Sequence, residues 1–136
     1  MLSACQKDEF SGTEDEQINS YIASKSITIT EKTTSGLRYI VTMPNAAGAV
    51  LKAGQTINVN YAGKFLSGKS FDSGNFSFVL AAGRVVKGFD EGIAKMKVGE
   101  KATIIFPSAL GYGSQATGSI PANSPLIFDI EVISAK

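Results

Sequence analysis

Residues 61–90 read YAGKFLSGKSFDSGNFSFVLAAGRVVKGFD, and they are the most informative part of this chain. Aromatic and aliphatic side chains dominate the segment, and it holds almost nothing that could act as a nucleophile or a base. A site built from such side chains suits a reaction in which no covalent bond is broken.

The overall composition excludes several classes of function. The chain has 136 residues, which is enough for one domain with a buried core and an appendage. It contains no histidine and a single cysteine, Cys5, so neither a Ser-His or Cys-His catalytic pair nor a zinc site of the usual type can be assembled. We therefore expect no metal and no cofactor. The net charge of +1 and the scattered lysines argue against binding to nucleic acid.

Residues 1–12 are predicted to form a flexible tether, because they are small and polar after Cys5 and have no hydrophobic period. The sequence Leu-Ser-Ala-Cys at residues 2–5 resembles the lipobox of bacterial lipoproteins, in which the cysteine is acylated. The alternative is an ordinary free cysteine. Acylation would place the protein in the bacterial cell envelope, on the periplasmic face or at the cell surface. No apolar run approaches the ~18 residues of a membrane span, so we expect membrane attachment only through a lipid on Cys5.

A helical extension is predicted for residues 13–34. Thr13 and Glu16 have the spacing of a capping box, and the helix is expected to run to about Ser24. A narrow apolar stripe on this helix consists of Ile18, Tyr21 and Ile22. A helix this short is marginal in isolation, so it docks on its own domain, on a partner or on nothing; docking on its own domain is the simplest interpretation.

From residue 37 onward the hydrophobic period becomes that of strands. Apolar and polar residues alternate in segments 37–43, 57–65, 76–80 and 126–132, and a further strand at 101–106 ends at Pro107. Such alternation predicts an antiparallel sheet with one covered face. The cover is predicted to be a helix within residues 88–96, whose apolar side carries Phe89, Ile93 and Met96. Residues 109–124 are predicted to form a long loop that projects Tyr112.

Five ordered blocks of the sequence resemble the signature blocks of FKBP-type peptidyl-prolyl cis-trans isomerases. They are VNYAG at 59–63, GKSFDS at 68–73, VVKGFDEG at 85–92, LGYG at 110–113 and IPANSPLIFDIE at 120–131. The resemblance covers residues 35–136, which we expect to form the isomerase domain. It implies an α+β fold in which a strongly twisted antiparallel sheet wraps around one short helix, and this agrees with the periodicity.

The resemblance also implies which residues line a pocket for proline. Catalytic roles are expected for Asp72, Tyr112 and Phe89. The expected substrate-binding residues are Tyr61, Phe71, Phe76, Val85, Val86, Ile120 and Phe128. The residue types alone allow a plainer interpretation for several of them: Tyr61 and Phe128 as core residues, Asp72 as a turn residue and Tyr112 as an exposed loop aromatic.

The partners implied by the resemblance are proline-containing polypeptides and a macrolide-type inhibitor, and we expect the protein to be a monomer. Many members of the family have tryptophan at the position of Phe89, whereas this chain has no tryptophan. That difference keeps a second hypothesis open, in which the domain is a proline-segment-binding module or a holdase chaperone with weak or no isomerase activity.

Overall fold

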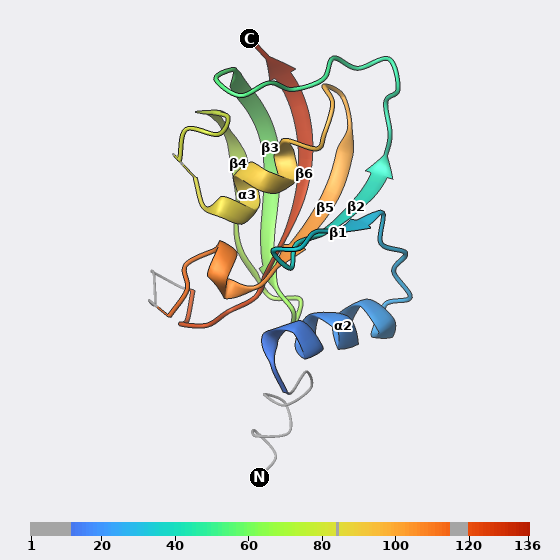
Figure 1. Cartoon of the computed structure of the whole chain (residues 1–136), viewed down its shortest axis with the longest axis vertical. Helices are drawn as coiled ribbons and strands as arrows, with labels where there is room; N and C mark the ends of the chain where they lie inside the picture. The colour runs from blue at the N-terminus through green and yellow to red at the C-terminus, as the bar shows by residue number, and fades with distance from the viewer. Residues whose placement is uncertain (1–11, 84, 115–119) are drawn as a thin grey trace.

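The computed structural model describes residues 12–83, 85–114 and 120–136. Within these residues, one six-stranded sheet accompanies two α-helices and one 3-10 turn (Figure 1). The helical elements are α2 (Glu14–Ser24), α3 (Lys87–Ile93) and η2 (Ser108–Leu110). The strands are β1 (Glu31–Lys32), β2 (Arg38–Met43), β3 (Thr56–Phe65), β4 (Ser70–Val79), β5 (Lys101–Phe106) and β6 (Leu126–Ala135). None of the helices described here is long and apolar enough to cross a membrane.

All neighbouring strands are antiparallel, in the order β1-β2-β5-β6-β3-β4. The predicted α+β fold is therefore confirmed. Strand β4 begins at Ser70, six residues before the predicted start at Phe76. The sequence gives no sign of this because residues 70–75 are largely polar, and their pairing with β3 on the edge of the sheet holds them extended.

Helix α3 packs against one face of the sheet, where the larger hydrophobic core lies (Figure 1). Two glycines allow the close approach. A Cβ atom at Gly92 would lie 2.6 Å from the Ile104 Cγ2 atom, and one at Gly88 would overlap the ring of Phe106. The helix ends at Ile93, earlier than predicted, although Met96 beyond it is 1% exposed and belongs to the same core.

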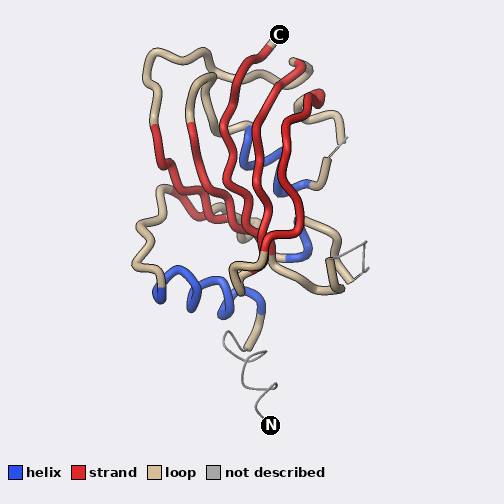
Figure 2. The backbone as a smooth tube through the Cα atoms, turned by 180° about the vertical axis from the view of Figure 1, so that it is seen from behind, coloured by secondary structure: helices blue, strands red, loops and turns tan. Residues whose placement is uncertain are grey.

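The other face of the sheet is also covered at one end, so the expectation of a single covered face was wrong. Helix α2 lies across this end (Figure 2), and its predicted capping box between Thr13 and Glu16 is present. Its apolar stripe is buried in a second hydrophobic cluster formed by Ile18, Tyr21, Ile22, Ile40, Leu66, Ile105 and Ile127. Of the alternatives left open for this helix, the structure shows docking on its own domain.

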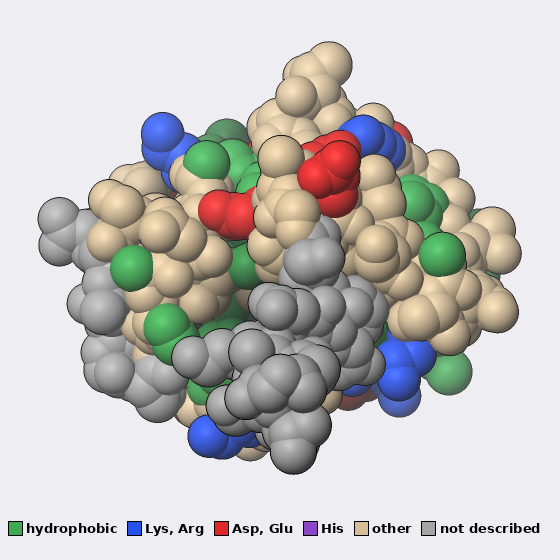
Figure 3. All heavy atoms as spheres, turned by 90° about the horizontal axis from the view of Figure 1, so that it is seen from below, with side chains coloured by type: hydrophobic (Ala, Val, Ile, Leu, Met, Phe, Trp, Pro, Cys, Tyr) green, Lys and Arg blue, Asp and Glu red, His purple; other side chains and the backbone are tan. Residues whose placement is uncertain are grey.

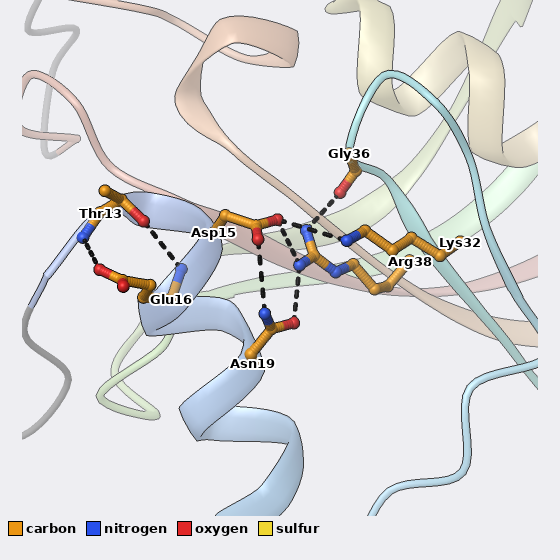
Figure 4. A network of polar contacts seen from close by, with 7 residues as sticks. All are labelled: Thr13, Asp15, Glu16, Asn19, Lys32, Gly36 and Arg38. Atoms are coloured by element: carbon orange, nitrogen blue, oxygen red, sulfur yellow. Dashed lines mark hydrogen bonds and ion pairs between the residues drawn. The ribbon is translucent and has the colours of Figure 1, made fainter.

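The docking of α2 also buries Arg38. The alternation of apolar and polar residues in 37–43 predicts that the side chain of Arg38 lies on the solvent-exposed face of the sheet. Its side chain is 0% exposed and reaches α2, where one guanidinium nitrogen donates to Asp15 Oδ1 at 2.6 Å and to Asn19 Oδ1 at 2.8 Å (Figure 4). A second nitrogen donates to the Gly36 carbonyl at 2.6 Å. The guanidinium holds the pKa of Asp15 below its ordinary value of 3.8, through the hydrogen bond first and the charge second. A buried arginine is tolerated here because a carboxylate accompanies it.

Candidate active site

A pocket of about 450 Å³ opens between the sheet, helix α3 and the segment after β5. Its lining is mostly aromatic and consists of Tyr61, Phe71, Asp72, Phe76, Val85, Val86, Phe89, Tyr112 and Phe128. These residues come from β3, β4, β6, the start of α3 and the residues after η2. Residues from positions 61 to 128 thus surround one cavity.

Strand register explains how the sheet residues meet. Gly63 on β3 lies opposite Asp72 on one side and opposite Phe128 on the other. The lack of a side chain at Gly63 is necessary, because a Cβ atom there would lie 2.7 Å from Phe71 Cζ and 2.8 Å from Phe128 Cε1. This glycine therefore makes room for two walls of the pocket, and sequence analysis did not single it out.

The bottom of the pocket is formed by Phe89, which is 3% exposed. Its ring centroid lies 5.2 Å from that of Phe128 in an edge-to-face contact, 5.6 Å from Phe76 and 6.3 Å from Tyr61. Tyr61 also contacts Phe76 edge-to-face at 5.3 Å. Such ring pairs hold each other in place, so the pocket presents a rigid apolar surface.

Polar groups are found at the rim. The Tyr61 hydroxyl donates to Asp72 Oδ2 at 2.8 Å, and the Ser73 N–H donates to Asp72 Oδ1 at 2.9 Å. The hydrogen bond to Asp72 raises the pKa of Tyr61 above its ordinary value of 10.0, with smaller contributions from burial and from the negative charge of Asp72. Tyr61 is therefore a neutral phenol that orients, and is oriented by, one carboxylate.

Two further rim residues occupy chain segments outside the sheet. Tyr112 is 36% exposed at the mouth of the pocket. Val86 is the N-cap residue of α3, and its carbonyl accepts from the N–H groups of Phe89 and Asp90. The backbone of Val86 is thus held by the helix that supplies the floor.

One residue expected at the site is not among the pocket lining. Ile120 is 7% exposed and belongs to the larger core instead. Cys5, the residue expected to be acylated, lies outside the described residues.

The arrangement suits binding more than bond-breaking chemistry. Among the residues that the structure describes, Asp72 is the single charged one that lines the pocket, and they contain no group of three or more His, Cys, Asp or Glu side chains that could hold a metal ion. In Figure 3, which views the molecule from the end nearest α2, the lysine and arginine side chains lie apart from one another near the outer edge of that end of the molecule. A small apolar ring can enter the pocket while groups attached to it meet the polar rim.

The fold and this pocket define a domain in which an antiparallel sheet packs on the short helix α3 beside an aromatic binding cavity. A model of the family described as FKBP-type peptidyl-prolyl cis-trans isomerase matches residues 48–133. The chain belongs to this family, as its sequence blocks predicted.

Individual relatives agree with this assignment. FK506-binding protein 2 of Dictyostelium discoideum is 40% identical over 109 residues, which cover 76% of this chain and 80% of that protein. FK506-binding protein 3 of Candida albicans is 46% identical over 94 residues, or 66% of this chain, and the chain spans only 22% of that protein's length.

Solved structures show the same architecture over most of the chain. The crystal structure of FkpA from Escherichia coli has a TM-score of 0.79 and 29% sequence identity, and the match covers 98% of this chain and 64% of that one. The crystal structure of AtFKBP13 has a TM-score of 0.71 and 34% identity over 76% of this chain and 96% of that one.

Proposed function

We propose that this protein accelerates the cis-trans rotation of X-Pro peptide bonds in folding or secreted polypeptides. The observation that supports this most is the buried Phe89 floor with the Tyr61 and Asp72 pair at its rim. The floor accepts an apolar pyrrolidine ring, and the rim lies where the flanking amide groups would be.

The catalysis needs no acid, base or covalent intermediate. Rotation about a peptide bond is opposed by a barrier of ~18 to 20 kcal/mol, because twisting sacrifices resonance. A twisted amide is less polar than a planar one, so its transfer from water into an aromatic pocket is less unfavourable. The pocket therefore binds the transition state more tightly than the ground state, which lowers the barrier.

The individual roles proposed here rest on the family resemblance and are supported by the positions of the side chains around the pocket. Phe89 is the floor beneath the ring, and Phe76, Phe128 and Val85 flank it. The Tyr112 hydroxyl and the Val86 N–H donate to substrate carbonyls on either side of the proline. Asp72 orders Tyr61 and faces the twisted bond.

The deciding experiment is an exchange assay, by NMR or a coupled protease, on a short Leu-Pro or Phe-Pro peptide. Acceleration by the full chain supports the isomerase. Suppression of aggregation of an unfolded protein, without acceleration of the peptide, would identify a holdase or binding module instead.

We further propose that the pocket accepts an FK506-type macrolide, which two relatives are named for binding. Competition by FK506 in the peptide assay tests this. The absence of inhibition at concentrations far above that of the protein would refute macrolide binding and leave the isomerase proposal intact.

A membrane anchor is proposed from the sequence alone. The Leu-Ser-Ala-Cys segment at residues 2–5 supports acylation at Cys5 and a place in the bacterial cell envelope. The intact mass of the natively expressed protein tests the proposal. A mass without acyl chains would refute it.

A further inference from the structure

Tyr112 is carried on a short segment that converges on Ser108. The Ser108 carbonyl accepts hydrogen bonds from the N–H groups of Gly111 and Gly113, both at 2.8 Å. These glycines flank Tyr112 directly. The direction in which Tyr112 leaves the backbone is therefore set by the position of Ser108.

Ser108 is in turn held by a residue of the N-terminal helix. Glu14 accepts a hydrogen bond from the Ser108 N–H with Oε1 and another from the Ser108 Oγ with Oε2, each at 2.6 Å. Ser108 opens the η2 turn, where the first N–H groups have no partner inside the turn. The preceding Pro107 is the N-cap residue and makes no side-chain cap. The carboxylate of Glu14 supplies this cap from 94 residues away in the sequence.

Glu14 itself is well placed for such a role. It is the first residue of α2, whose apolar stripe and contact with Arg38 hold the helix on the sheet (Figure 4). The apolar stripe packs with Ile105, which lies on β5 only three residues before Ser108. The helix and the η2 turn are therefore anchored to the same end of the sheet. Ser108 is 5% exposed, so its two bonds to a carboxylate are partly protected from water.

We infer that Glu14 is a positioning residue for Tyr112, and that helix α2 is part of the catalytic unit. The inference rests on the proposed isomerase function. Glu14 does not touch the pocket. It acts through Ser108, whose carbonyl fixes the two amides beside Tyr112, and so it keeps the Tyr112 hydroxyl where a substrate carbonyl can reach it.

The first test compares Glu14→Ala with Glu16→Ala in the full chain. Glu16→Ala is the matched control because it removes the same charge from the same turn of α2, and Glu16 caps Thr13 without contacting Ser108. We expect Glu14→Ala to lower kcat/KM on the Leu-Pro peptide by about threefold, and Glu16→Ala to leave it near the wild-type value. Equal activity of the two variants would overturn the inference.

The second test asks whether the loss passes through Tyr112. In a Tyr112→Phe background, Glu14→Ala should produce no further loss, because the hydroxyl that Glu14 positions is already gone. A full and independent loss in the double variant would show a merely structural role and overturn the inference. Glu14→Gln retains one acceptor oxygen, and it replaces Glu14→Ala if the alanine variant does not fold.

The third test does not depend on activity. Native-state hydrogen exchange at the Gly111 and Gly113 amides reports how firmly Ser108 holds the segment. We expect faster exchange at both amides in Glu14→Ala than in Glu16→Ala, and unchanged exchange would overturn the inference. If the wild type fails to accelerate the peptide while these amides respond to Glu14, the proposed isomerase function fails and the anchoring of the Tyr112 segment stands.

Discussion

Replacement of Asp72 by alanine is the most direct probe of the pocket. The carboxylate accepts from the Tyr61 hydroxyl at 2.8 Å. A hydrogen bond to a charged group contributes about 1.5 to 3 kcal/mol when it is shielded from water. Asp72 is exposed and Tyr61 only half-buried, so we expect Asp72→Ala to lower the free energy of unfolding by about 1 kcal/mol. The fold should therefore persist.

We expect Asp72→Ala to affect catalysis more than it affects stability. Loss of Asp72 leaves the Tyr61 hydroxyl without its acceptor and removes the negative charge at the rim of the pocket. We expect kcat/KM on a Leu-Pro peptide to fall about tenfold, which corresponds to about 1.4 kcal/mol of transition-state stabilisation. NMR exchange measured on wild type and variant at equal concentrations provides the comparison.

The pKa of Tyr61 provides an independent measurement of the effect of Asp72→Ala. Its raised pKa means that the folded state favours the neutral phenol, so this contribution to stability is present below pH 10.0 and is lost as the pH rises through the folded pKa. In Asp72→Ala the pKa of Tyr61 should fall toward its ordinary value of 10.0, because the main cause of the shift is removed. Titration of the phenolate absorbance, with a Tyr61→Phe variant to assign the signal, measures this.

Asp129→Ala is a matched control for the carboxylate. Asp129 also accepts from a hydroxyl, that of Thr103 at 2.6 Å, but it does not line the Phe89 pocket. The Asp129→Ala variant should leave both kcat/KM on the Leu-Pro peptide and the pKa of Tyr61 unchanged. If Asp72→Ala retained full activity while the Tyr61 pKa fell as expected, the catalytic role of Asp72 would be refuted.

Three further perturbations follow from the packing. Asp15→Asn should lower the free energy of unfolding by about 2 kcal/mol in denaturant unfolding, because Arg38 stays buried without its carboxylate, although the side chain of Asp15 is 54% exposed. Because the pKa of Asp15 in the folded state lies below 3.8, the stabilisation by its carboxylate is present above pH 3.8 and is lost as the pH falls through the folded pKa. The difference in free energy of unfolding between wild type and Asp15→Asn should therefore disappear in acid. A difference that does not change with pH would contradict the pairing of Asp15 with Arg38. Gly63→Ala should destabilise the protein by about 1 to 3 kcal/mol and reduce peptide turnover, because its Cβ would push Phe71 and Phe128 into the pocket. Gly54→Ala is its control: it has φ of +89° but no neighbour within 4 Å, so it should lower the unfolding midpoint without changing turnover by the folded protein.

Much of the fold could be predicted because it depends on local spacing. The Thr13 and Glu16 capping box is a contact between residues three positions apart, and the alternation in β3 reports one buried face directly. Polar residues 70–75 lack such a period, so the first half of β4 could be found only from its pairing with β3.

At the site, too, some features could be predicted from the sequence and others could not. Nine residues that the family resemblance singles out surround one pocket in the structure, and their individual roles stay predictions until they are tested. Ile120 stands in one of the sequence blocks that carry this resemblance and is buried in the larger core, but it is not among the residues that line the pocket. A block of sequence can place a residue near a site, but whether its side chain lines the cavity depends on packing against residues far away in the chain.

By itself, the sequence determined where most of the helices and strands form, which residue types could line a cavity, and which chemistry the absence of histidine rules out. The tertiary structure decided that Arg38 is buried, that Gly63 lies between Asp72 and Phe128, and that Glu14 caps the turn before Tyr112. The physical reason is that residue periodicity reflects contacts within a few positions. Those three features depend instead on strand register and on the docking of α2, which bring together residues that are far apart along the chain.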